Sequence, residues 1–220
     1  MFPHMVSIID DENNLCGGFI ISDRHIVTAA SCVKDINDPK HLVVSGGSTM
    51  LNDGKIIKIS KIKKHPLYDP ITTRRYAYDV AVMKTMNHMT FDDYMNMIEL
   101  PQENEVVAVS SRIVVAGWGE PEEEDYYSEE LRKVTLVVND IKDCNETDHE
   151  GQLTDHMLCA GNRRGRAACW GDTGGAAVQN SKAVGIILDA PSCGVPSMSS
   201  LFTNVASPAI RAFIMNETGI

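Results

Sequence analysis

Short runs of aliphatic and β-branched residues, separated by turn-forming residues, recur along most of this chain. Gly, Pro, Asn and Asp lie between the runs, and this pattern is typical of an all-β sandwich or barrel. The runs that we expect to be strands cover residues 19–21, 26–28, 42–44, 80–82, 113–115, 134–138 and 184–187.

Two further segments carry more specific patterns. Residues 55–63 alternate imperfectly between Ile and Lys, as a half-exposed strand does, and we interpret the lysines as a solvated face rather than a binding stripe. Residues 208–216 are expected to form a short helix after an N-cap at Ser207. The apolar side of this helix comprises Ile210, Phe213 and Ile214.

Composition and charge exclude several classes of protein. The 220 residues are 43% hydrophobic, which is enough for one domain with a buried core. The net charge of -10 repels phosphate backbones, so we expect no nucleic-acid partner. No apolar run approaches the ~18 residues of a membrane span, so we expect no membrane association. The first ten residues lack the pattern of a signal peptide, so we expect that a secreted form has lost its leader.

The six cysteines form an even set, which favours disulfide bonds in an oxidising compartment. No C-x-x-C pair is present, so the spacing does not support a zinc site, and we expect neither a metal nor a cofactor. The count alone leaves the connectivity open. The cysteines are Cys16, Cys32, Cys144, Cys159, Cys169 and Cys193, and glycosylation sequons begin at Asn145 and Asn216.

Residues 120–130 carry a high density of Glu and Asp around two tyrosines. Like charges repel each other, so we expect an exposed loop. A solvated loop is the simpler interpretation. The alternative is a docking site for a basic partner, anchored by Tyr126 and Tyr127.

Several motifs occur in a distinctive order along the chain. They are residues 16–18 (CGG), 27–32 (VTAASC), 79–84 (DVAVMK), 116–119 (AGWG), 157–161 (MLCAG) and 169–175 (CWGDTGG). In this order and spacing they resemble the chymotrypsin/trypsin family of serine proteases over almost the whole chain. The resemblance implies an all-β fold of two antiparallel six-stranded barrels, about 1–108 and 109–205, with an active-site cleft between them and a C-terminal helix. It also implies the disulfides Cys16–Cys32, Cys144–Cys159 and Cys169–Cys193.

The catalytic positions implied by this resemblance are degenerate. Ser31 occupies the general-base position, where the family has His, and Thr173 occupies the position of the nucleophilic Ser; Asp79 matches the buried acid. A hydroxyl needs a neighbouring base before it can attack, and a serine at position 31 cannot be that base. Losing the base or the nucleophile costs on the order of 10⁶-fold in rate, although an oxyanion hole at Gly171 and Thr173 would retain ~10³–10⁴ over water.

The histidines of the chain offer no substitute base at these motifs, and we expect His65 to lie in a surface turn that the family shares. The histidines are His4, His25, His41, His65, His88, His149 and His156.

The substrate pocket implied by the resemblance is altered as well. Ala167 replaces the acid of a trypsin-like pocket, so a Lys or Arg side chain finds no counter-charge there. The strand that pairs with the substrate backbone ends in Pro191, which has no N–H to donate. Taken alone, the pocket is also consistent with changed specificity. The former pocket positions are Ala167, Trp170, Leu188, Asp189, Ala190 and Ser200.

Active members of the family bury a new amino terminus against the acid that matches Asp172. The sequence begins downstream of that terminus, so we expect Asp172 to lack a partner. We therefore expect rearrangement or disorder over residues 170–174.

These features predict a secreted, extracellular and monomeric pseudoprotease that acts by binding proteins. Ser31, Asp79 and Thr173 together resemble the inactivated serine protease paralogues of scabies and related mites. That resemblance implies the gut lumen as a location and host proteins, including complement components, as partners. The basic segments 74–75 and 163–166 are expected in loops that face a partner.

Two other functions stay open. The first is a weakly active or altered endopeptidase that uses Thr173. The second is a decoy that sequesters protease inhibitors, which the altered substrate strand disfavours.

Overall fold

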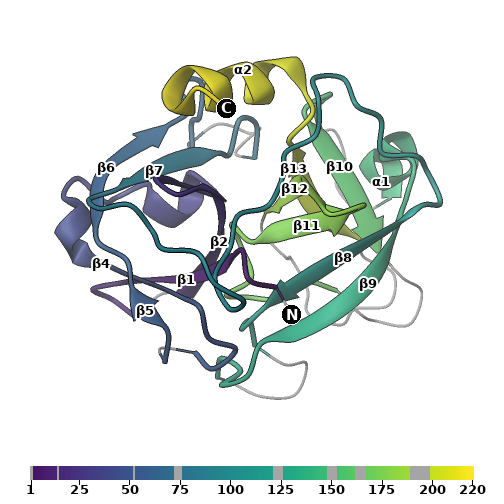
Figure 1. Ribbon diagram of the computed structural model, residues 1–220. Coiled ribbons are helices and arrows are strands. Elements are labelled where there is room, and N and C mark those ends of the chain that lie inside the picture. The colour runs from purple at the N-terminus through teal and green to yellow at the C-terminus, as the bar shows by residue number, and fades with distance from the viewer. Residues whose placement is uncertain are drawn as a thin grey trace.

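Figure 1 shows a computed structural model of the chain, in which two antiparallel β-sheet units lie side by side and a C-terminal helix crosses one side of them. The structure describes residues 2–13, 15–51, 53–71, 76–120, 126–147, 153–161, 167–188 and 199–220, without the side chains of 145–147. No helix in these residues is long and apolar enough to cross a membrane.

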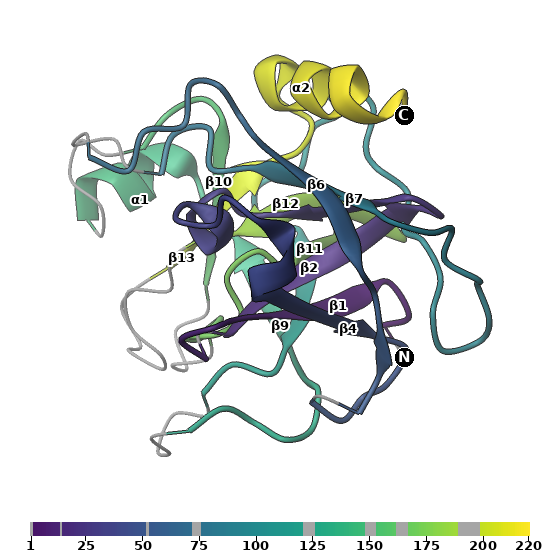
Figure 2. The same ribbon diagram turned by 90° about the vertical axis from the view of Figure 1, so that its left-hand side faces the viewer.

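The first unit is a seven-stranded antiparallel sheet with the strand order β5-β4-β1-β2-β3-β7-β6. Only residues 57–58 separate the two edge strands β5 and β6 along the chain, so the sheet curls back on itself (Figure 2). The strand expected over 55–63 is therefore two strands, and the unit is a curled sheet rather than a closed six-stranded barrel. The strands are β1 (Met5–Asp10), β2 (Leu15–Ser22), β3 (His25–Thr28), β4 (Leu42–Gly46), β5 (Lys55–Ile56), β6 (Ile59–Lys64) and β7 (Ala81–Thr85).

The second unit closes into a six-stranded antiparallel barrel with the order β10-β13-β12-β11-β8-β9, as the resemblance implied. The helix α1 (Ile141–Thr147) lies against β10 on its outside (Figure 1). The strands are β8 (Arg112–Gly117), β9 (Arg132–Val138), β10 (Met157–Gly161), β11 (Ala176–Gln179), β12 (Lys182–Ile187) and β13 (Ser200–Asn204).

Four strands, β1, β10, β11 and β13, and the helix α1 were not predicted from hydrophobic runs. The strand β13 shows why, because its sequence SLFTN mixes polar and apolar residues, yet Ser200 and Thr203 are buried. Protein covers both faces of this strand, and strand preference depends on such packing more than on the residues themselves.

One hydrophobic core joins the two units. It contains Phe19 and Val82 from the first unit, Trp118 and Ile186 from the second unit, and Phe213 from the C-terminal helix. The indole N–H of Trp118 also donates to the Thr49 carbonyl oxygen at 2.9 Å. Burial of this shared surface fixes how the two units sit and so positions the cleft between them.

The C-terminal helix α2 (Pro208–Thr218) confirms the predicted helix and extends two residues further. Its apolar residues Ile210, Phe213 and Ile214 are all buried, as expected. Ser207 is the N-cap residue, but its hydroxyl makes no capping bond and lies instead 2.6 Å from Nδ1 of His156.

Two of the three implied disulfides are present. Cys16–Cys32 joins β2 to the 3₁₀ helix η1 (Ser31–Val33), and Cys144–Cys159 joins α1 to β10. The pairing of Cys169 with Cys193 stays a prediction, because Cys193 lies outside the described residues.

We predict that Gly174→Ala destabilises the protein by about 2–4 kcal/mol in urea unfolding. Gly174 has a φ of +88°, and a Cβ there would overlap the Gly17 carbonyl oxygen and the Thr28 hydroxyl. Gly219→Ala is the matched control, because Gly219 has a φ of +79° but nothing within 4 Å of an added Cβ. The control should lose only about 1–2 kcal/mol of stability, because it adds backbone strain but no steric overlap. Equal losses in the two variants would contradict the overlap.

Candidate functional site

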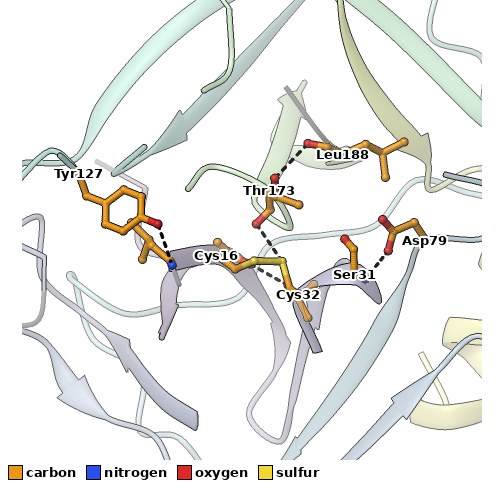
Figure 3. The surroundings of a disulfide bond; sticks show 10 residues. Cys16, Ser31, Cys32, Asp79, Tyr127, Thr173 and Leu188 are labelled. Atoms are coloured by element: carbon orange, nitrogen blue, oxygen red, sulfur yellow. Dashed lines mark hydrogen bonds between the residues drawn. A yellow bond between two sulfur atoms is a disulfide. The ribbon is translucent and has the colours of Figure 1, made fainter. Parts of the chain in front are cut away.

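A cleft of about 360 Å³ is lined by Ser31, Asp79 and Thr173, the three positions that match a catalytic triad (Figure 3). Ser31 begins η1 shortly after β3, Asp79 precedes β7, and Thr173 lies in the turn before β11. Segments far apart in the sequence therefore meet here, on both sides of the junction between the two units.

Asp79 holds main chain in place rather than an imidazole. Its carboxylate is buried, and Oδ1 accepts a hydrogen bond of 2.8 Å from the backbone N–H of Ser31. The Thr203 hydroxyl donates to the Asp79 carbonyl oxygen at 3.0 Å. In a complete triad this carboxylate would orient the general base. Here its contacts connect η1 and β13 around the cleft.

Tyr78, directly before Asp79, has a φ of 57°, which non-glycine residues seldom adopt. Its ring stacks on the ring of His65 at a centroid distance of 4.7 Å, and its hydroxyl lies 3.1 Å from Nε2 of His156. The two histidines therefore hold the side chain of Tyr78, and with it the backbone that presents Asp79. His65 begins the expected surface turn, in which residues 66–67 are exposed, but its own ring is buried.

The Thr173 hydroxyl donates to the carbonyl oxygen of Leu188 at 3.2 Å. Leu188 begins the segment that, by the resemblance, pairs with a substrate backbone, so this acceptor is already occupied from within the chain. The Thr173 carbonyl oxygen accepts a bond of 2.7 Å from the N–H of Gly17. It also lies 3.4 Å from Sγ of Cys32, a sulfur that is in a disulfide and has no proton to give (Figure 3).

Among the described residues, no histidine lines this cleft. His65 and His156 hold Tyr78, while His41 contacts Asp11 in a neighbouring groove. Tyr68 does line the cleft, but burial, and secondarily the charge of Asp79, raise the pKa of its phenol above the ordinary value. The Tyr68 phenol therefore stays protonated at neutral pH and is no base. His149 lies outside the described residues.

Gly171, the former oxyanion position, has a φ of +95°, and its Cα faces the ring of Tyr127. A Cβ on Gly171 would lie 3.0 Å from that ring, and the Tyr127 hydroxyl accepts a bond of 3.3 Å from the N–H of Leu15 (Figure 3). Tyr127 is thus partly buried in the site and is unsuited to anchor an external partner. Tyr126 is 61% exposed and keeps that role as a prediction. Residues 121–125 lie outside the described residues.

Asp172 has hydrogen-bond partners, so the expectation of an unpaired carboxylate is wrong. Its Oδ1 accepts from the N–H of Gly119 and its Oδ2 from the N–H of Cys169, both at 2.8 Å. Residues 170–174 are all placed, so the expected disorder is also wrong, while the alternative of a rearranged loop stays a prediction. The carboxylate packs so closely that a Cβ on Gly117 or Gly119 would overlap it. Burial raises the pKa of Asp172 to about 6, against the opposing effect of the two N–H donors.

The former pocket residues are only partly within the described chain. Ser200 is buried, and its hydroxyl accepts a bond of 3.2 Å from the N–H of Ala168, beside Ala167. Leu188 is fully buried, whereas Trp170 is 62% exposed. Besides His149 and Cys193, the residues of predicted sites that lie outside the described part are Asp189, Ala190, Pro191, 74–75, 163–166 and the side chain of Asn145. Asn216 is exposed on α2.

We predict that Asp79→Ala destabilises the protein by about 1–3 kcal/mol, because the N–H of Ser31 loses its acceptor. Asp79→Asn keeps an acceptor oxygen at the same place and is expected to lose less. Urea unfolding of the three proteins measures this order. An alanine variant as stable as the parent would show that the bond has no structural role.

We predict that ionisation of the Asp172 carboxyl lowers the stability of the folded protein as the pH rises. Its folded pKa of about 6 is above the ordinary value of 3.8, so the folded state binds this proton more tightly. The associated stability is present below pH 4 and is lost as the pH rises through 6. Because part of the residue is accessible, we expect about 1–2 kcal/mol.

Asp172→Asn tests this cost, with the exposed Asp93→Asn as the control. The unfolding free energy of the Asp172 variant relative to the parent should rise by about 1–2 kcal/mol between pH 4 and 7, whatever its absolute value. No such rise, or an equal rise for the Asp93 variant, would contradict the assignment.

The amino-acid sequence is similar to those of several insect proteins named trypsins. Trypsin 5G1 of Aedes aegypti is 30% identical over 221 residues, covering 99% of this chain and 81% of its own. A trypsin of Simulium vittatum is 34% identical over 192 residues, which cover 86% of this chain and 74% of the length of that trypsin.

Solved structures superpose over nearly the whole chain. The scabies mite inactivated protease paralogue S-D1 has a TM-score of 0.87 at 27% identity, covering 99% of this chain and 94% of its own. Mouse neuropsin has the same fold, with a TM-score of 0.87 at 23% identity over 98% and 94%. The family model described as Trypsin matches residues 1–213, so the chain belongs to the trypsin family of serine proteases.

Proposed function

We propose that this protein is a catalytically inactive member of the trypsin family that acts by binding other proteins. The observation that carries the proposal is the position of the Thr173 hydroxyl, which donates to the Leu188 carbonyl oxygen where a nucleophile would face an imidazole. Ser31, at the general-base position, has no group that takes up a proton at neutral pH.

The rate argument follows from proton transfer. An alcohol attacks a peptide carbonyl only as its proton is removed, and general-base catalysis supplies this step in the family. Neither an imidazole nor an ionised phenol lines the described cleft. Its carboxylate, Asp79, accepts from the N–H of Ser31, and the Thr173 hydroxyl is directed instead to the Leu188 carbonyl oxygen, which is no general base. The Thr173 methyl group also adds bulk where a substrate carbonyl would approach.

The similar proteins agree on the family of this chain but differ from one another in catalytic activity. The curated relatives are named trypsins, whereas the scabies mite structure is an inactivated paralogue. Residues 31 and 173 of this chain therefore decide between activity and its loss, and both favour loss. Host proteins, with complement components first, remain our proposed partners, and extracellular secretion is consistent with the two disulfides.

An acidic groove supports a protein partner with a basic surface. It has a volume of about 640 Å³, adjoins the cleft and shares Ser31 and Cys32 with it. Lys34 and His41 also line it, and Lys34 and Lys40 pair with two of its acids, but the acids outnumber the basic residues. The groove therefore attracts cationic surfaces and repels anionic ones. Its acidic lining residues are Asp10, Asp11, Glu12, Asp35 and Asp38.

We predict no peptide hydrolysis by the purified protein and no labelling by a fluorophosphonate probe. A panel of chromogenic peptides with different P1 residues measures turnover, and Thr173→Ala is the matched control for contaminating protease. Equal background for parent and variant is the expected result. Turnover that disappears in Thr173→Ala would overturn the proposal in favour of an altered endopeptidase.

We also predict that the protein inhibits complement activation in serum, measured as deposition of activated components on a coated surface. Asp10→Asn/Glu12→Gln/Asp35→Asn should weaken inhibition about tenfold. Asp93→Asn/Glu103→Gln/Glu217→Gln, exposed residues elsewhere, should leave it unchanged. Absence of inhibition by the parent would reject complement as the partner, and equal effects of both variants would reject the groove.

A further inference from the structure

We propose that the outer face of the first sheet binds a sulfated polysaccharide through a row of basic side chains whose charge comes from four lysines. The residues of this basic sheet face are His25 on β3, Lys84 on β7, Lys61 and Lys63 on β6, and Lys58 just before β6. The lysines of residues 55–63 are thus assigned a binding role in place of the solvated face that their sequence pattern favoured.

Strand register brings the central basic residues of this face together. His25 pairs with Lys84, and Lys84 pairs with Lys61, so three basic residues stand directly opposite one another on adjacent strands. Paired residues share a face, and neighbouring strands lie about 4.8 Å apart. In Figure 2 the strand β6 passes in front of β7, at the surface of the molecule.

A β-bulge aligns the remaining lysines with this row. Lys58 and Lys61 are three positions apart, which in a regular strand would place them on opposite faces. The register shifts between Ile59 and Lys61, so the intervening residue is an extra one and Lys61 turns outward, as Lys63 does. Ile59 and Ile62 point into the core of the sheet. The alternation of Ile and Lys in the sequence is imperfect because this bulge adds a residue to the strand.

This arrangement is unfavourable for the isolated protein. Like charges directly opposite each other on neighbouring strands repel. The pKa of His25 is lowered by burial and then by the charges of Lys84 and Arg24, which shows the crowding of positive charge at this place. Asp23 acts in the opposite direction, but it lies 2.5 Å from Nδ1 of His88. Among the described residues, no ion pair forms with the four lysines.

Protection of a sheet edge explains only part of the face. Lysines on an edge strand prevent edge-to-edge association, and β6 is an edge strand. Lys61 and Lys63 fit that role. Lys84 and His25 do not, because β7 and β3 are interior strands with neighbours on both sides.

The chemistry of the face favours a sulfated sugar chain over a nucleic acid. All four strong cations are lysines, which act as point charges for separate anionic groups. His25 is the only aromatic ring on the face, so unpaired bases find little to stack on. At one end, Lys58 lines a groove of about 400 Å³ with Asn87 and His88, whose polar groups suit sugar hydroxyls. Disulfides also place the protein where extracellular polysaccharides occur.

The test is a titration with a heparin oligosaccharide, followed by fluorescence at several salt concentrations. The parent should bind, with a logarithmic affinity that falls linearly with the logarithm of salt concentration. Lys61→Gln/Lys63→Gln/Lys84→Gln should lower the affinity at least tenfold and reduce the slope by ~2–3. The same variant should be as stable as the parent or more stable, because the repulsion is removed.

Lys40→Gln/Lys133→Gln/Lys142→Gln is the matched control, since it changes the net charge equally at exposed sites elsewhere. It should retain most of the affinity. Three results would overturn the proposal: no heparin binding by the parent at low salt, equal losses in both triple variants, or binding of desulfated heparin or duplex DNA as tight as that of heparin.

Discussion

The two units of the molecule meet where the N–H of Gly17 on β2 donates to the carbonyl oxygen of Thr173, at 2.7 Å. The approach is so close that a Cβ on Gly17 would lie 2.9 Å from Cα of Gly175. Only glycines allow two backbones to come this near. The Cys16–Cys32 disulfide lies beside the same contact and ties η1 to it. The cleft exists because this backbone junction is kept.

The junction constrains the main chain and leaves the side chains free to change. Asp79 keeps a bond to the N–H of Ser31, Asp172 keeps two backbone donors, and Gly171 keeps a positive φ. Each of these preserves the shape of a protease cleft. Ser31 and Thr173 stand where the family has its catalytic His and Ser, so the main chain of the site is retained while two of its side chains differ. Under our proposal that catalysis is lost, the fold still offers a rigid, grooved surface for binding.

Charge is distributed unevenly over that surface. A net charge of -10 would suggest a uniformly acidic protein, yet acids gather in the groove beside the cleft and lysines gather on the outer face of the first sheet. Such separation allows one molecule to engage a basic and an acidic partner at distinct places. The two proposed interactions are therefore independent, and either can fail without the other.

The all-β class and the C-terminal helix could be predicted from the periodicity of the sequence, because that signal is local. The positions of Ser31, Asp79 and Thr173 and two disulfide pairs were implied by the resemblance of the surrounding motifs to a known family, since the cysteine count left the pairing open. The folded chain was needed to reveal the strands β11 and β13, the bulge in β6, the burial of His65, and the partners of Asp172 and Thr173. Each of those depends on a residue distant in the chain, such as Gly119 for Asp172 or Leu188 for Thr173. A hydrogen bond or a burial is a property of two segments at once, and a sequence pattern describes only one.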